Sequence, residues 1–166
     1  MPSGKAHAEM TLAAASLTYI WAIRSGVETP VQAGAAAVGC AVGLVLTPDL
    51  DLVGTRADAL IRRQGLAPAI VWGLLWAPYS ALISHRSILS HGLVLGTLLR
   101  LAYIAVPLGI MGLLPRPSPL LARAVLGLLI SDNLHVGADW LLSGIKDLWE
   151  WKINSLKGTR KHRRKI

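Results

Sequence analysis

The stretch PLLARAVLGLLISDNLHVGADWLL, residues 119–142, decides the fold because it combines a long apolar run with ionisable residues. Its length matches the roughly 20 residues that a helix needs to cross the hydrocarbon core of a bilayer. Asp132, His135 and Asp139 recur at intervals of three and four residues, so they share one helical face. Ionisable side chains are costly when they face lipid, so we expect this face to point toward other helices, water or metal.

Four further apolar blocks precede this stretch. They cover residues 6–24, 31–46, 66–83 and 91–114. Hydrophobic residues make up 53% of the 166-residue chain, more than a soluble domain of this size usually needs for its core. Polar turns rich in Gly and Pro separate the first block from the second and the fourth from the last. The sequence therefore predicts an all-α integral membrane helical bundle with about four spanning helices in two hairpins.

The block at residues 66–83 has a different expected role. When the two hairpins fold back about turns near Glu28 and Arg116, Asp49 and His85 are expected at the same membrane face. They share a face only if the block between them does not cross the membrane. Its two prolines and its Trp and Tyr residues suit an interface. We therefore expect a re-entrant or interfacial helix here.

The same folding brings imidazoles and carboxylates from distant blocks to one depth. The expected metal ligands are His7, Asp49, Asp51, His85, His91, His135 and Asp139, with His135 about one helical turn deeper. Imidazole and carboxylate without thiolate suit Zn²⁺, and also Mn²⁺ or Fe²⁺. The number of ligands permits one or two ions, and two ions could polarise a phosphoryl oxygen and activate water. Asp51 is also a catalytic base in this interpretation, and Arg86 binds an anion.

Each part of this site also has a structural interpretation. Asp132 is expected at the level of Arg100, which favours a buried ion pair between the last two blocks over a ligand role. Asp49 or Asp51 could instead cap a turn or a helix. His7, close to the N-terminus, could simply be solvated. We favour the metal site because four of the five histidines are expected at about one depth.

Basic residues are expected on the same side as this site. They are Lys5, Arg56, Arg62, Arg63, Arg86 and a C-terminal run from Lys157 to Lys165, against Arg24, Arg116 and Arg123 on the other side. Because Lys and Arg favour the cytoplasmic side, the chain is predicted to be multi-pass with a cytoplasmic C-terminus. Residues 1–145 are expected to form the membrane helical metal-binding domain, and residues 146–166 a basic cytoplasmic tail. The formal net charge of +8 therefore indicates contact with membrane lipids, and no nucleic acid partner is expected.

These motifs resemble a family of bacterial, often cyanobacterial, metal-binding integral membrane proteins, and more distantly the YdjM-type membrane-bound metal-dependent hydrolases. The resemblance covers nearly the whole chain and rests on residues 2–7, 48–51, 85–91, Arg100 with Tyr103, and 132–139. The chain departs from the pattern at Ala8, where an acidic residue is common, and at Ser90, where the hydrolases have a Thr-His-Ser arrangement. The resemblance implies a location in the bacterial cytoplasmic membrane or the thylakoid membrane.

Two functions remain open at this point. One is an enzyme that hydrolyses a phosphate ester or a phospholipid-like substrate at the cytoplasmic interface, which the resemblance to hydrolases implies. The other is a non-enzymatic membrane protein in which metal joins the two hairpins or is sensed, stored or passed on. A chain of 166 residues has too few helices for an obvious transport pathway unless it forms a homo-oligomer.

Overall fold

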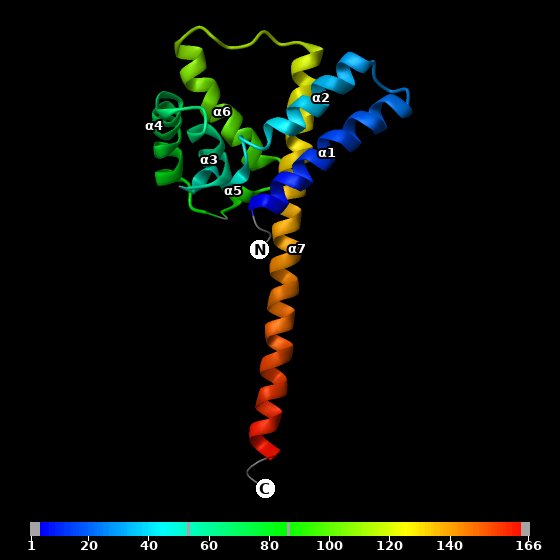
Figure 1. Ribbon diagram of the computed structural model, residues 1–166, viewed down its shortest axis with the longest axis vertical. Helices are drawn as coiled ribbons and strands as arrows, with labels where there is room; N and C mark the ends of the chain where they lie inside the picture. Colours follow the sequence, from blue (N-terminus) through cyan, green and yellow to red (C-terminus); the bar gives the residue numbers. More distant parts are fainter. Residues whose placement is uncertain (1–3, 53, 86, 164–166) are drawn as a thin grey trace.

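The computed structural model describes residues 4–52, 54–85 and 87–163, together with the side chains of this part up to Trp149 except that of Asp147. All regular secondary structure in these residues is helical. The elements are α1 (Gly4–Arg24), α2 (Pro30–Val42), the 3₁₀ helix η1 (Pro48–Asp51), α3 (Arg56–Arg62), α4 (Leu66–Leu82), α5 (Ile88–His91), α6 (Leu95–Ile110) and α7 (Pro119–Arg163). Figure 1 shows α7 as a long central helix, with the other elements gathered around its N-terminal part.

The first predicted hairpin is present as α1 and α2. Gly26 takes a left-handed backbone conformation (φ +66°) in the turn, and Thr29 caps α2 through a capping box with Gln32. Glu28 in the same turn forms an ion pair of 2.7 Å with Arg123 near the start of α7. The turn of the hairpin is therefore fixed against the N-terminal end of the central helix.

Close backbone contact joins α2 to α7. A Cβ atom added to Gly127 would lie 1.8 Å from the carbonyl oxygen of Ala36, and one added to Gly39 would lie 1.8 Å from that of Ala124. Only glycine fits at these two positions. Small residues at helix contacts of this kind are typical of packing in membranes, where backbones approach closely. This contact places the C-terminal end of α2, and the turn that follows it, beside the polar face of α7.

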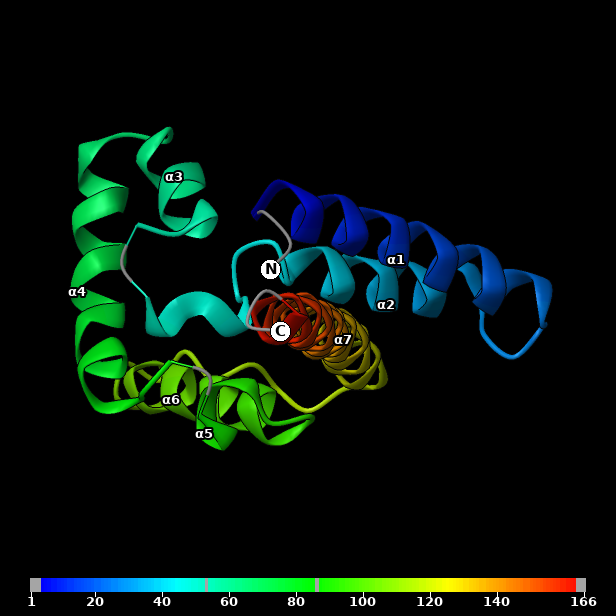
Figure 2. The same ribbon diagram turned by 90° about the horizontal axis from the view of Figure 1, so that it is seen from below.

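The stretch between the second and third apolar blocks contains η1 and α3. Thr55 caps α3 in a capping box with Asp58, whose carboxylate also accepts a hydrogen bond of 2.9 Å from Trp72 Nε1 on α4. This bond ties α3 to α4, and Trp76 of α4 stacks on Tyr103 of α6 with ring centroids 5.6 Å apart. Figure 2, which views α7 end-on, shows that α4 runs across the direction of α7.

The block expected as one helix from residue 91 to residue 114 is divided in two. His91 ends the one-turn helix α5, and the chain then changes direction at Val94, the one described non-glycine residue with positive φ (+62°). Asn133 Oδ1 on α7 accepts a hydrogen bond of 3.2 Å from the Val94 backbone N–H. His91 therefore stands at the end of a short helix rather than in the first turn of the long one.

The second predicted hairpin is only partly present, because α6 and α7 separate toward their linker (Figure 1). The N-terminal part of α6 meets α7 at Asp132, which forms a buried ion pair with Arg100, as the sequence predicted. Thr97 also donates a hydrogen bond of 2.6 Å to Asp132 Oδ2. Arg100 and Asp132 are 2% and 3% exposed. The extended linker at residues 113–118 includes Pro115 and Pro117, which cannot continue a helix and keep the two helices apart.

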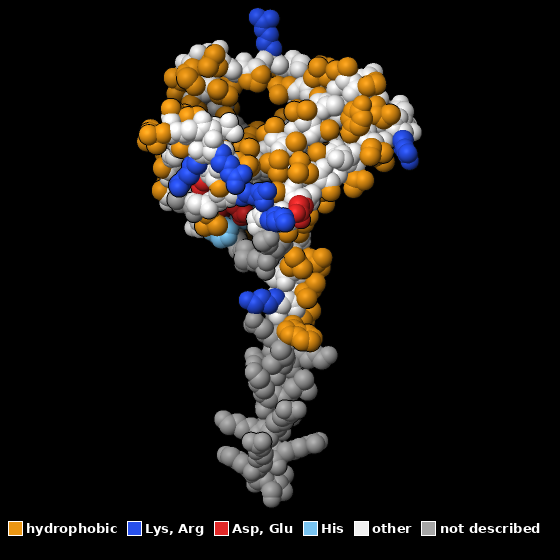
Figure 3. Space-filling model, in the orientation of Figure 1, with side chains coloured by type: hydrophobic (Ala, Val, Ile, Leu, Met, Phe, Trp, Pro, Cys, Tyr) orange, Lys and Arg blue, Asp and Glu red, His pale blue; other side chains and the backbone are white. Residues whose placement is uncertain are grey.

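One stretch of the described chain, Pro119–Lys146 in α7, is long and apolar enough to cross a membrane, whereas α2, α4 and α6 are apolar but shorter. Many large hydrophobic side chains are exposed, among them Leu17, Trp21, Leu74, Ile110 and Leu141. Figure 3 shows hydrophobic side chains over much of one face, and Lys and Arg side chains gathered near the lower edge of the helical head. The all-helical class is therefore confirmed, and a bundle of about four spanning helices stays a prediction.

The contact between α2 and α7 predicts opposite effects for the same substitution at two glycines of α7. Gly127→Ala should lower the free energy of unfolding by about 1–3 kcal/mol or more, because its Cβ would overlap the Ala36 carbonyl. Gly137→Ala should raise it by about 0.5–1 kcal/mol, because that Cβ meets no atom and alanine favours a helix. Denaturation of both variants of the full chain measures this difference, and equal effects would contradict the packing.

Candidate metal site

Three elements carry the carboxylates and imidazoles that lie closest together. The Thr47 hydroxyl accepts a hydrogen bond from the Asp49 backbone N–H, and Pro48 follows Thr47 at the first position of η1. This tight turn holds Asp49 and Asp51 at the end of the α2 segment. Ser87 caps α5, which ends at His91, and α7 carries His135 and Asp139. Local sequence is enough to form each of these elements, but the packing of α2 and α6 against α7 brings their side chains together.

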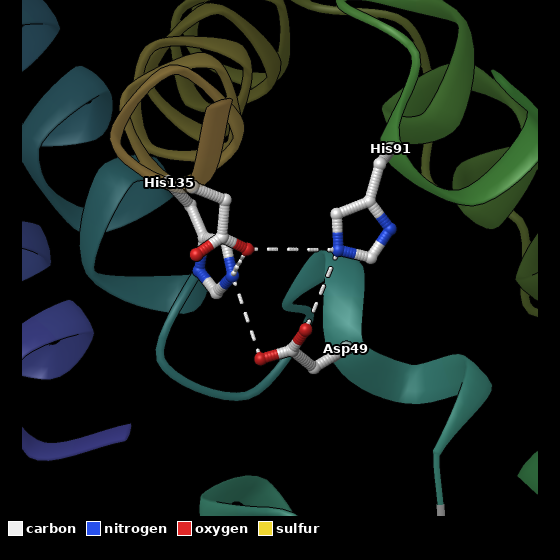
Figure 4. Close-up of side chains that lie close together, drawn as sticks. Asp49, His91 and His135 are labelled. Carbon is white, nitrogen blue, oxygen red and sulfur yellow. Dashed lines mark ion pairs between the residues drawn. The ribbon is translucent and has the colours of Figure 1, made fainter. Parts of the chain in front are cut away.

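Asp49, His91, His135 and Asp139 form the first group. Each offers one ligand atom, and these four atoms lie within 4.8 Å of one another. Asp49 Oδ1 lies 3.4 Å from His91 Nε2, and Asp49 Oδ2 lies 3.4 Å from His135 Nε2. Asp139 Oδ2 is 3.7 Å from His135 Nε2 and 4.0 Å from His91 Nε2. Figure 4 shows Asp49, His91 and His135 pointing toward one another from these different elements.

The nitrogen and oxygen atoms of this group are better placed to bind a cation than to form hydrogen bonds with one another. His91 Nε2, His135 Nε2 and both oxygens of Asp139 are buried, and none has a hydrogen-bond partner among the described residues. Buried polar atoms without protein partners are costly, so such a cluster favours a bound cation. Ligands about 2.0–2.2 Å from a tetrahedral ion stand about 3.3–3.6 Å apart. The observed spacings are close to this range and need little movement to reach it.

The charge of Asp49 also suits a cation. Burial alone would raise the pKa of its carboxyl group, but the imidazoles of His135 and His91, each 3.4 Å away, outweigh burial. Together they hold the pKa of Asp49 well below its usual range. Asp49 is therefore a carboxylate at neutral pH, which is the form that binds a divalent metal.

Asp51, His85 and His91 form a second group. Asp51 Oδ1 lies 2.9 Å from Nδ1 of His85, at hydrogen-bond distance, and its Oδ2 lies 3.8 Å from Nδ1 of His91. The sequence predicted one set of ligands for one or two ions, and the structure places six of these seven residues in two groups that share His91. Asp51 is buried and His85 is partly exposed, so the orientation of the His85 ring depends on Asp51.

His7 lies at the edge of the first group. Its ring stacks on that of His135, with centroids 3.7 Å apart and an angle of 8° between the planes. His7 Nε2 lies 3.2 Å from Asp139 Oδ1. The start of α1 is therefore attached to the cluster, and His7 can act as a further ligand or orient Asp139. Arg86, predicted to bind an anion, lies outside the described residues.

Ser90 and Thr97 support the site, although the sequence analysis assigned no role to either. Ser90 Oγ lies 3.0 Å from His91 Nδ1, and the Ser90 carbonyl accepts a hydrogen bond of 3.0 Å from Arg100. Arg100 is in turn paired with Asp132, to which Thr97 also donates. This network fixes the turn that carries His91 to α7. A serine beside a histidine is too common for the sequence alone to reveal this contact.

A cavity of about 300 Å³ adjoins the cluster. Its walls include His7, Asp49 and His135 from the cluster, and Thr55 and Arg56 from the start of α3. The cluster is therefore not completely enclosed by protein, and a small molecule can reach the first group from this side. The volume is at the lower end of the range for small-molecule sites, roughly 300–1,000 Å³.

Comparison with known proteins assigns the chain to a family. Residues 2–117 match the family described as uncharacterized metal-binding protein (DUF2227), which covers more than half of the 166 residues. The matched stretch includes His7, Asp49, Asp51, His85 and His91, and it ends before α7. The description names metal binding, and neither a membrane location nor a hydrolase activity. No curated protein and no solved structure matches the chain. On the strength of the family match, the chain belongs to the DUF2227 family of uncharacterized metal-binding proteins.

Proposed function

We propose that the chain binds one divalent transition metal ion through Asp49, His91, His135 and Asp139. The observation that carries this proposal is the set of buried nitrogen and oxygen atoms that face one another without hydrogen-bond partners. Two imidazoles and two carboxylates in four-coordinate spacing favour Zn²⁺, and Mn²⁺ or Fe²⁺ accept the same ligands. A second ion between Asp51 and His85 would require His91 Nδ1 to give up its contact with Ser90.

Metal content of the purified full chain tests this assignment. The wild-type protein should retain about one metal ion per chain, and His91→Ala should lose it, because His91 contributes a ligand atom. His85→Ala should keep the ion, as should His162→Ala, which removes the one histidine outside the predicted site. A wild-type protein without metal, or equal metal content in all four proteins, would contradict the proposal. Two ions that fall to one in His85→Ala would support a second site.

We also propose that this site lies at the cytoplasmic face of a membrane, inside a multi-pass helical bundle. Three features support the placement: the length and hydropathy of Pro119–Lys146, the exposed apolar surface, and the Lys and Arg near the cluster. The 21 residues of α1 rise about 31 Å, a length that would reach across the hydrocarbon core, but α1 is less apolar than Pro119–Lys146. The 13 residues of α2 and the 16 of α6 are fewer than the roughly 20 needed. The cluster lies just after the end of α2 and just before the start of α6. If these short helices cross only part of the bilayer, the cluster would lie at headgroup depth.

Alkaline carbonate extraction of membranes tests this placement. An integral bundle should stay in the membrane pellet, because its exposed apolar side chains lose their stabilising lipid contacts on release. Removal of residues 146–166, the basic tail, should leave this retention unchanged if the helices span the bilayer. Release of the full chain by carbonate would contradict the bundle, and release of only the shortened chain would indicate attachment through the tail.

The cavity beside the cluster favours an enzyme within this proposal. A divalent ion bound there would activate water and polarise a phosphoryl oxygen of a phosphate ester or phospholipid-like substrate. Asp51 accepts a hydrogen bond from His85 Nδ1, which orients the ring and leaves Nε2 to take up or deliver a proton. The open side at His7 and Asp49 would admit the substrate.

The non-enzymatic alternative rests on how widely the ligands are drawn from the chain. Residues of η1, α5 and α7 meet at the first group, and α6 and α7 separate away from it. A metal ion there would hold these elements together without any turnover, as structural zinc does. In this case all coordination positions would be filled by protein, and the cavity would have no catalytic role.

Turnover and thermal stability separate these two functions. For an enzyme, metal-loaded protein should release phosphate or headgroup from a panel of phosphate esters and phospholipids. Asp51→Asn should reduce that rate about 10²–10⁴-fold with metal content unchanged, because proton transfer is impaired. For a structural metal, chelation should lower the Tm by several degrees while every substrate stays intact. Inactivity of fully metal-loaded protein across the panel would contradict the hydrolase.

A further inference from the structure

The cavity beside the cluster is lined by a basic residue as well as by metal ligands. His7, Asp49 and His135 line this cavity together with Gly54, Thr55 and Arg56 at the start of α3. Gly4 closes part of the rim, since a Cβ on this residue would lie 3.6 Å from Arg56 Cβ. Among the described residues, Arg56 is the one Lys or Arg that lines this cavity.

Arg56 has no ion pair or hydrogen bond from its side chain within the described part of the chain. The buried arginine Arg100 is paired with Asp132, and Arg123 is paired with Glu28. Arg56 is exposed at the start of α3. Its guanidinium is therefore free to bind a ligand, and the fork of N–H donors on an arginine matches the oxygens of a phosphate.

We propose that this cavity binds a phosphate group between the metal cluster and Arg56, with Arg56 as the residue that selects for the phosphate. The inference rests on the proposed metal site, because Asp49 on the cavity wall would repel an anion unless a cation offset its charge. A phosphate has enough oxygens to face the cluster on one side and a guanidinium on the other. An alcohol has one oxygen and cannot do both, and a carboxylate offers only one oxygen to each side.

The remaining walls suit an ester rather than a fully hydrated ion. Ala8, Leu44 and Leu52 line the cavity together with the polar residues. An organic group attached to the phosphate would contact these side chains, and the volume of about 300 Å³ limits the enclosed part to a small group. The phosphate could belong to a lipid headgroup or to a soluble ester, and both would make the same contacts with Arg56.

Binding of inorganic phosphate to the metal-loaded full chain in detergent tests this role of Arg56. Arg56→Gln should weaken phosphate binding at least about tenfold, since a charge-assisted contact to the anion is lost. Arg63→Gln is the matched control, because Arg63 is also exposed next to α3 but does not line the cavity. It should bind phosphate as tightly as the wild type. Equal affinity in all three proteins would overturn the proposal.

Metal content measured on the same samples separates this inference from the metal site itself. Metal-free protein should bind phosphate far more weakly than loaded protein, and Arg56→Gln should retain as much metal as the wild type. If the wild type holds no metal, the proposed function fails and this inference fails with it. If metal is retained but Arg56→Gln binds phosphate normally, only this inference fails. Loss of metal in Arg56→Gln would also overturn it, by showing that Arg56 maintains the cluster.

Competition then identifies the source of the phosphate. Phosphatidic acid in mixed micelles and soluble glycerol phosphate are each added to protein with bound inorganic phosphate. Displacement by phosphatidic acid alone indicates a lipid headgroup, and displacement by glycerol phosphate indicates a soluble ester. Micelles of phosphatidylcholine without phosphatidic acid control for detergent effects. Failure of both phosphate monoesters to displace inorganic phosphate would contradict a site for esters.

Discussion

The central constraint on this structure is the burial of carboxylates and imidazoles among apolar helices, because burial without a compensating partner costs free energy. Asp51, His91, His135 and Asp139 are all buried, and several of their polar atoms have no hydrogen-bond partner in the described residues. Such groups are stable in a protein interior only when an opposite charge compensates for their lost hydration. A bound cation would satisfy the carboxylate oxygens and the imidazole nitrogens together.

The rest of the helical framework brings these groups together from distant parts of the sequence. Gly39 and Gly127 let α2 approach α7 closely, and this contact positions η1 with Asp49 beside His135. The ion pair of Arg100 with Asp132 performs the same task for the turn that carries His91. Neither contact touches a substrate or a metal. Both place ligand atoms, because a shift of one helix relative to α7 would separate the first group.

The cluster lies close to the surface of the protein, beside basic side chains and a cavity. It lies where the α2 segment ends, where α5 ends and where α6 begins, close to the Lys and Arg side chains near the lower edge of the head (Figure 3). The cavity beside it is lined by His7, Asp49 and His135 and also by Arg56. An enclosed metal ion would need neither the cavity nor a basic wall. A ligand with negative charge would use both.

The sequence by itself determined the helical class, the Arg100–Asp132 pair and the residue types of the site, because apolar block length and helical spacing are local properties. The distance of each residue from the turn of its predicted hairpin also placed His91 and Asp139 at the same depth, and the structure brings them to 4.0 Å. Tertiary structure alone decided that the ligands divide into two groups, that α5 breaks the fourth block, and that Arg56 lines the cavity beside the cluster. These depend on side-chain direction and on long-range packing against α7, which residue spacing does not encode.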